Sequence, residues 1–182
     1  MSKNINIEKL KFPIGEFKKP AIISAEQIEI WISDIEQFPK KLDALVSNLT
    51  KEKLNWTYRP FGWTIQQVVH HCADSHINSF CRFKLSLTED TPLIRPYFED
   101  KWAELPDVLA ADIADSLNII NGLHSRWTIL LKSLNANDLL KEFIHPEHGK
   151  RFSLAENIGI YAWHGNHHLA HIEQAIRFRG EM

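Results

Sequence analysis

The sequence predicts an all-α protein built as a four-helix bundle, and three observations support this class. Four long stretches carry apolar residues at steps of three and four, which is the spacing of one buried helix face. Three of these stretches follow a serine or threonine with Gln or Glu three residues later, the capping-box pattern of a helix start. No stretch shows the convincing alternation of a β-strand. Residues 1–182 are therefore expected to form a single bundle domain.

The composition restricts the classes of partner. Hydrophobic residues make up 44% of the chain, which is typical of a globular protein. The net charge of -2 gives no basic excess for a nucleic acid, and the apolar runs are too short to span a membrane. The N-terminus lacks the apolar segment of a signal peptide, and two cysteines, Cys72 and Cys81, are too few for a disulfide framework. We therefore expect a cytoplasmic protein that binds neither nucleic acid nor membrane.

The first elements are an arm and a long helical region. Residues 1–23 contain two prolines and little periodicity, so we expect an extended arm lying over the domain. The first helix is expected after Ser24, whose hydroxyl can accept a hydrogen bond from the Gln27 amide. Its apolar stripe extends to residue 49, and Pro39 interrupts it. A kink, or two helices meeting end to end, is expected at that proline.

The second helix is expected to begin after Thr64 and to end near residue 87. The connection that follows, residues 88–106, contains three prolines, which disfavour helix. So long a connection can cross the whole bundle, and the second and third helices would then be roughly parallel.

The third helix is expected to be capped by Asp107, with a clear apolar stripe from Leu109 to Leu134. Residues 135–152 mix a short helical turn with a loop. A capping box at Ser153 opens the final helix, which should end near Gly180.

The unusual feature of the composition is the ten histidines, because seven of them fall in two short helical segments. Residues four apart lie on one face of a helix, so a His-x-x-x-His pair can present two imidazoles to one ion. Neutral imidazole suits Zn²⁺, Ni²⁺ and related ions. The alternative is that the histidines are surface or buried polar groups, but so many in two segments favour metal binding.

On the last segment, two pairs fit the spacing equally well: His164 with His168, and His167 with His171. The first pair lies on a helix face whose other residues are apolar, whereas the second pair lies on a face that carries both polar and apolar residues. The periodicity therefore leans towards the first pair without excluding the second.

On the earlier segment the choice is between His70 and His71. The pattern leans towards His71, which lies one turn beyond Val68. The residues alone leave this choice open as well.

The histidines lie within longer motifs whose order and spacing are specific. Those motifs include FPIG at 12–15, VVHH at 68–71, ADSH at 73–76, IRPY at 94–97, KWAELP at 101–106, LHSRW at 123–127 and YAWHGNHHLAHI at 161–172. Over most of its length the chain resembles the DinB superfamily of metal-binding four-helix bundles, and more closely its YfiT-like branch.

The resemblance implies a four-helix bundle of DinB type with a long crossover between helices 2 and 3. It also implies a metal held by one histidine of the second helix and a His-x-x-x-His pair of the last. On this sequence those residues are His71, His164 and His168. One divalent metal per chain is implied, zinc first and nickel second, and so is a homodimer.

Three protein ligands leave a coordination position open, which is typical of a reactive metal site. That position can take a water for hydrolysis or a thiol for nucleophilic transfer. The family resemblance implies both classes, namely metal-dependent hydrolases and transferases of a bacillithiol-type thiol. We expect transfer of a low-molecular-weight thiol to an electrophile, because no general base is obvious and Gly165 stands where a zincin has its glutamate. The alternatives are a hydrolase and a non-catalytic metal-binding stress protein.

Three further residues are candidates for the catalytic machinery. Asp74 can orient a ligand or take a proton, although a role at the helix surface is the alternative. Tyr161 lies one turn before His164 and can hydrogen-bond a bound group, or else pack in the core. Arg95 can bind an anionic substrate at the cavity rim, or else pair with a neighbouring acid.

Overall fold

The computed structural model describes residues 7–147 and 149–181, and four long helices make up most of it. The long helices are α2 (Ala25–Val46), α4 (Ile65–Thr88), α7 (Ile113–Lys132) and α9 (Leu154–Phe178). The short elements are α1 (Ile7–Lys11), α3 (Lys51–Leu54), α5 (Glu99–Trp102), α6 (Pro106–Ala110), α8 (Ala136–Leu140), β1 (Glu142–His145) and β2 (Lys150–Ser153). The predicted helical bundle is confirmed. Within the described residues, no helix is both long and apolar enough to span a membrane.

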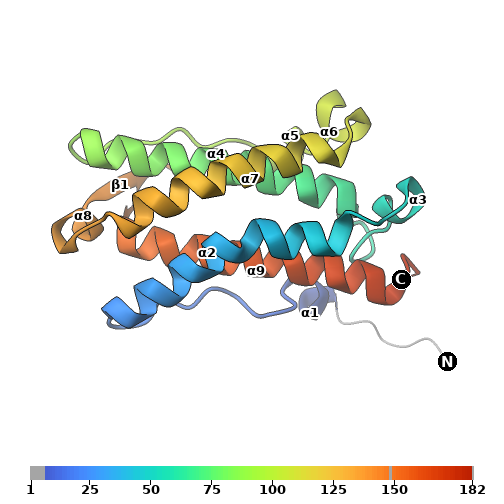
Figure 1. Cartoon of the computed structure of the whole chain (residues 1–182), viewed down its shortest axis with the longest axis horizontal. Coiled ribbons are helices and arrows are strands. Elements are labelled where there is room, and N and C mark those ends of the chain that lie inside the picture. Colours follow the sequence, from blue (N-terminus) through green and yellow to red (C-terminus); the bar gives the residue numbers. More distant parts are fainter. Residues whose placement is uncertain (1–6, 148, 182) are drawn as a thin grey trace.

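The long helices pack as two parallel pairs. Figure 1 shows α2 and α9 running in one direction and α4 and α7 in the other. Because α4 and α7 pack against each other, the second and third long helices are parallel neighbours. The connection between them carries α5 and α6 back along the bundle before α7 begins (Figure 1). This arrangement confirms the crossover predicted from the prolines.

Helix α2 continues through Pro39 instead of dividing into two helices. A proline inside a helix removes the hydrogen bond to the carbonyl four residues earlier and bends the helix. The ribbon of α2 accordingly changes direction along its length in Figure 1. Of the two expected outcomes at Pro39, a bent single helix is the one observed.

The expected start of the third long helix at Asp107 is wrong. Asp107 lies inside α6, a short helix that ends where Ala111 takes up an extended conformation (ψ 157°). The cap of α7 is Asp112, whose carboxylate accepts a hydrogen bond from the Ala114 amide at 2.9 Å. Leu109, the first residue of the expected stripe, is 55% exposed because it precedes this break. Asp107 and Asp112 can each cap a helix, and only the packing of the crossover decides which of them caps α7.

The structure also contains two short strands that the sequence did not predict. Strands β1 and β2 form an antiparallel hairpin in which Phe143 is paired with Phe152. Each strand has only four residues, too few to show an alternation in the sequence. The crossover adds to the hairpin, since the Ile144 amide donates to the Pro92 carbonyl (2.9 Å) and the Ile94 amide to the Ile144 carbonyl (3.0 Å).

The N-terminal arm lies along α9, but it is not extended throughout because it contains α1. Its residues 1–6 lie outside the described part of the chain. The Trp163 indole donates to the Gly15 carbonyl at 3.0 Å, and Lys19 pairs with Glu156 at 2.6 Å. The Glu156 side chain is thereby turned to the arm, so the cap at Ser153 keeps only the Glu156 amide bond to its hydroxyl (3.2 Å).

The core consists of two apolar clusters with a buried polar layer between them. One cluster gathers around Leu42, Val69 and Ile172, and the other around Phe83 and Trp127. On three of the long helices histidines lie between the clusters: the buried His76 on α4, His124 on α7 and His168 on α9, and the partly buried His164 on α9. This layer positions the candidate site inside the bundle.

Gly159 sets the close approach of α9 to α2. A Cβ at this position would lie 2.7, 2.8 and 2.9 Å from three atoms of the Trp31 ring. Gly159→Ala should gain about 1 kcal/mol from helix propensity but lose about 1–3 kcal/mol from overpacking against a rigid ring. We expect a net loss in the free energy of unfolding, measured by chemical denaturation.

Gly122 provides the matched control for that substitution. It lies in α7, and a Cβ there would have no atom within 4 Å. Gly122→Ala should therefore raise the free energy of unfolding by about 1 kcal/mol. Equal effects of the two substitutions would show that the contact with Trp31 does not constrain α9.

Candidate metal centre

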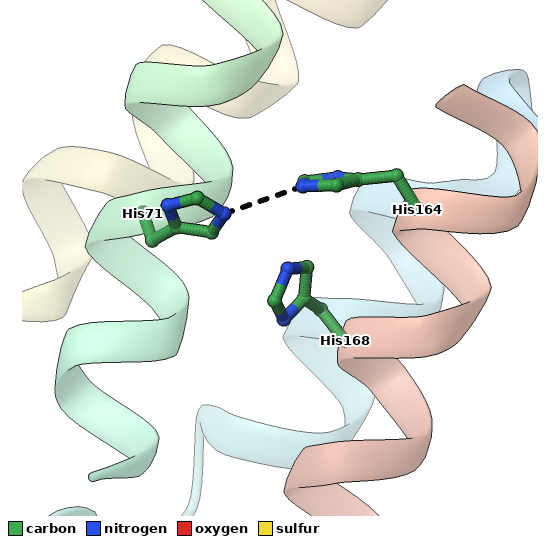
Figure 2. Close-up of side chains that lie close together, drawn as sticks. All are labelled: His71, His164 and His168. Atoms are coloured by element: carbon green, nitrogen blue, oxygen red, sulfur yellow. Dashed lines mark hydrogen bonds between the residues drawn. The ribbon is translucent and has the colours of Figure 1, made fainter. Parts of the chain in front are cut away.

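Three histidines from two helices converge in the polar layer. The Nε2 atom of His71 on α4 lies 3.2 Å from the Nε2 atom of His164 on α9. With His168, one turn further along α9, they form a group whose ligand nitrogens all lie within 4.8 Å of one another. Figure 2 shows the three rings directed towards a common point between the two helices. The structure thus brings together the three residues selected in the sequence, while metal ligation itself stays a prediction.

The three histidines that were the alternative ligands each contact another side chain. His70 is turned towards α7, where its Nδ1 atom lies 2.7 Å from the Ser116 hydroxyl. His167 stacks on the Trp163 ring with the ring centres 4.5 Å apart. His171 stacks on the Tyr58 ring with the ring centres 3.8 Å apart.

The donor set fits a divalent metal. Two nitrogens about 2.05 Å from a tetrahedral zinc ion are about 3.3 Å apart, close to the spacing of His71 and His164. Burial lowers the pKa of His71 to about 4, and it lowers those of His164 and His168 well below their ordinary value. The three imidazoles are therefore neutral near pH 7, and each has a lone pair for a ligand bond.

Two cavities meet at the histidine group. The larger has a volume of about 670 Å³ and is lined by His164, Tyr161, Ser75 and Tyr97 among others. The second, of about 360 Å³, is lined by all three histidines of the group. Because His164 borders both cavities, a molecule in either one can reach the group.

A family model for the DinB superfamily, DinB_2, matches residues 34–172, which is more than half of the chain. The chain belongs to the DinB superfamily.

Curated relatives and a solved structure agree with this assignment. A Bacillus subtilis (strain 168) protein named "Putative metal-dependent hydrolase YfiT" is 47% identical over 171 residues, covering 94% of this chain and 96% of the relative. A Bacillus cereus (strain B4264) protein, also named a "Putative metal-dependent hydrolase", is 51% identical over 164 residues, covering 90% and 93%. The YfiT structure superposes with a TM-score of 0.92, covering 94% of this chain and 98% of YfiT, and it is described as "a probable metal-dependent hydrolase with an unusual four-helix bundle topology".

In this DinB chain, Tyr161 is placed beside the group. Its hydroxyl donates to the Ser75 carbonyl at 3.2 Å and lies 3.3 Å from the Ser75 hydroxyl. The Ser75 hydroxyl is in turn 3.4 Å from Nε2 of His164. Tyr161 is buried and lines the larger cavity, so it both packs in the core and presents its hydroxyl at the site.

The other two catalytic candidates are not brought to the site. Asp74 lines neither cavity; desolvation, together with the charge of Asp107, raises its pKa to about 6. Arg95 is exposed, lines neither cavity and, among the described residues, makes no ion pair with Glu99 or Asp100. Asp74 instead lies near α6 of the crossover, close enough for the charge of Asp107 to act on it.

Sequence reasoning missed the charged residues around the cavities. Glu99 and Asp100 of α5 line both cavities, and Arg82 of α4 lines the larger one. Partial desolvation, with the nearby charges of Asp100 and Glu147, raises the pKa of Glu99. Arg82 follows His71 by eleven residues, or three helical turns, a spacing that could have placed it on the same face. The position of α5 depends on the course of the crossover, for which the sequence holds no local signal.

Gly165 occupies the place of a zincin glutamate for a packing reason. A Cβ at Gly165 would lie 2.9 Å from Cδ2 of Phe38 on α2. The position therefore faces the neighbouring helix and not the cavities, so a glutamate there could not act on a bound substrate.

The buried histidines predict a marked pH dependence of stability. Among the described residues, burial lowers the pKa of eight of them: His70, His71, His76, His124, His164, His167, His168 and His171. Below pH 6.5 the unfolded chain takes up protons that the folded chain excludes, so acidification favours unfolding. Each such group contributes up to about 1.4 kcal/mol per pH unit.

The free energy of unfolding should fall from about pH 6.5 down to about pH 4, where His71 and His124 begin to protonate in the folded state. The raised pKa values of Asp74 and Glu99 have the opposite effect, because acidification then favours the folded state, but these two groups are fewer than the histidines. Urea unfolding of metal-free protein at about pH 7, 6 and 5 should give a steadily falling free energy of unfolding. A constant value across these conditions would contradict the buried, neutral state of the histidines.

Proposed function

We propose that this chain is a metal-dependent enzyme that transfers a low-molecular-weight thiol, of bacillithiol type, to an electrophile at His71, His164 and His168. The observation that carries the proposal is the pair of cavities, about 670 and about 360 Å³, that meet at His164. Sites for small molecules commonly measure about 300–1,000 Å³, so each cavity has room for one reactant. A transfer reaction needs two reactants beside one ion, whereas hydrolysis needs one substrate and a water.

The ion that suits three neutral imidazoles is a single divalent metal per chain, zinc first and nickel second. When bound, it would supply a Lewis acid that favours the thiolate form of a thiol near neutral pH.

The larger cavity offers polar groups at the end where it reaches His164. The Tyr161 and Ser75 hydroxyls lie 3.3 Å apart there, and they can hold a substrate atom by hydrogen bonds. Arg82 and Lys101 line the same cavity and can bind an anionic group of a thiol.

The apolar walls of this cavity suit the body of an electrophile. The aromatic rings that line it are Tyr97, Phe98, Phe143, Phe152 and Tyr161. A reactant held against them would be kept from water while its reactive atom faces His164.

A second candidate function is metal-dependent hydrolysis, and Glu99 is the observation that favours it. Glu99 borders both cavities, and its raised pKa brings it closer to the range of a general base. The curated relatives are also named metal-dependent hydrolases.

The test compares two reactions of the metal-loaded protein. With monochlorobimane and a small thiol (cysteine, glutathione or bacillithiol), transfer should form a fluorescent thioether and release chloride at a rate that depends on both reactants. With nitrophenyl esters and no thiol, little cleavage is expected. The same assays with metal-free protein give the background.

The alternative outcomes separate the remaining functions. Ester or amide cleavage without any dependence on thiol would replace the transferase by the hydrolase, and Glu99→Gln should then lower that rate strongly. No turnover in either assay, with a metal that resists exogenous azide, would favour the non-catalytic binding protein.

The homodimer implied by the family resemblance and the cytoplasmic location stay predictions. Size-exclusion chromatography with light scattering measures the first directly. Among the described residues both cysteines are free, with Cys72 buried and Cys81 exposed.

A further inference from the structure

Two buried histidines outside both cavities form a chain that ends on His164. His76 on α4 and His124 on α7 are 1% and 2% exposed, and neither lines a cavity that reaches the metal centre. The Nδ1 atom of His76 lies 2.7 Å from Nε2 of His124, and the Nε2 atom of His76 lies 3.1 Å from Nδ1 of His164. Two charged imidazoles could not share such short contacts, so the rings must alternate donor and acceptor atoms.

The direction of these bonds follows from the far end of the chain. Nδ1 of His124 lies 2.6 Å from the backbone carbonyl of Ile35, and a carbonyl only accepts, so this Nδ1 carries the hydrogen. In a neutral His124 ring the Nε2 atom then carries no hydrogen, that is, it is bare, so it must accept a hydrogen bond from Nδ1 of His76. By the same reasoning His76 has a bare Nε2, which accepts from Nδ1 of His164. The Nε2 atom of His164 is left bare, and it is the atom that faces His71.

The carbonyl of Ile35 is available because of Pro39. In a helix this carbonyl would accept from the amide of residue 39, but proline has no amide hydrogen. The defect in α2 therefore creates a buried acceptor, and the His124 ring satisfies it.

His168, the second candidate ligand on α9, is oriented in the same way by a shorter chain of hydrogen bonds. Nε2 of His171 lies 2.9 Å from the Lys11 carbonyl, so it donates, and Nδ1 of His171 is bare. It can then accept from Nδ1 of His168 at 3.4 Å, which leaves Nε2 of His168 bare. Figure 2 shows one ring nitrogen of His168 directed towards the other two histidines and the other directed away.

We propose that His76 and His124, anchored on the carbonyl that Pro39 leaves free, are positioning residues that fix the tautomer and orientation of His164 for metal binding. This inference rests on the metal site of the proposed function, but not on the reaction catalysed there. Partners that orient a ligand histidine commonly change metal affinity by about 10–100-fold.

The first test is the tautomer pattern of metal-free, ¹⁵N-labelled protein at neutral pH. Long-range ¹H–¹⁵N spectra should show His124, His76 and His164 as neutral rings protonated at Nδ1. Histidines that merely fill space have no reason to share this order. An Nε2-protonated form at His76 or His164 would overturn the proposal, and this test needs no variant.

The second test is metal affinity, measured by competition of Zn²⁺ with a chromophoric chelator. His124→Phe removes the acceptor for His76 and should weaken Zn²⁺ binding by about 10–100-fold. His124→Gln can return an acceptor oxygen to His76 and should recover most of the affinity. Pro39→Ala adds an amide that competes for the Ile35 carbonyl and should give a smaller loss.

Phe83→Leu provides the control for lost stability, because Phe83 is fully buried in the second apolar cluster and takes no part in the chain. It should destabilise the fold without changing the affinity for Zn²⁺. A folded His124→Phe variant with wild-type affinity would overturn the proposal. Absence of thiol transfer would leave both tests intact, so failure of the proposed function is distinguishable from failure of this inference.

Discussion

His164→Ala is expected to abolish high-affinity metal binding and, with it, any metal-dependent activity. His164 contributes the nitrogen 3.2 Å from His71, and it is the ligand that borders both cavities. Its loss removes one of three protein ligands, so the affinity should fall on the order of 100-fold or more, beyond the effect of a supporting residue. Elemental analysis of purified protein and Zn²⁺ titration measure this directly.

The same substitution should remove the stabilisation that the metal provides. A ligand present at about 1,000 times its dissociation constant stabilises the folded state by about 4 kcal/mol. Added Zn²⁺ should therefore raise the melting temperature of the wild-type protein but not that of His164→Ala.

His167→Ala is the matched control, because His167 lies on the same helix but is stacked on Trp163. It should keep its metal. Equal metal content in His164→Ala and His167→Ala would refute the ligand assignment.

Trp127→Ala is expected to give the largest loss of stability of any substitution considered. Trp127 is completely buried and contacts rings on α4 and α9 as well as His124 of its own helix. Truncating a buried tryptophan costs about 3–5 kcal/mol, a large part of the 5–15 kcal/mol that stabilises a typical domain. Denaturant unfolding should show the midpoint falling accordingly.

Trp127→Phe separates the packing of this side chain from its polar atom. The indole Nε1 of Trp127 is buried and has no hydrogen-bond partner among the described residues. Phenylalanine keeps most of the apolar contact and removes this unsatisfied donor, so the loss should stay below about 1.5 kcal/mol. A loss as large as that of alanine would mean that the indole makes a polar contact that stabilises the core.

The helices could be predicted because their signals are local. The capping box of Thr64 and Gln67 forms in full, and α4 begins at the residue that it indicated. The start of α7 could not be predicted, since Asp107 and Asp112 are both acceptable caps. The hairpin was missed because its strands are short and its position depends on pairing with the crossover near Pro92.

The candidate site was predictable in part for a related reason. Spacing shows that His164 and His168 share one face of a helix, but it cannot show which face turns towards α4. The rotation of α9 is set by the packing of Leu169, Ile172 and Ala175 in the first apolar cluster. Family resemblance supplied the choice that periodicity left open, and the convergence of the three rings agrees with it.

The sequence by itself determined the helical class, the crossover and the short set of histidines from which a metal site could be drawn. Only the tertiary structure decided which charged residues border the cavities and that His76 and His124 connect His164 to the carbonyl freed by Pro39. The physical reason is that periodicity and caps act within a few residues of the chain. The cavities and the histidine chain instead depend on side chains from α2, α4, α7 and α9 meeting in one buried layer.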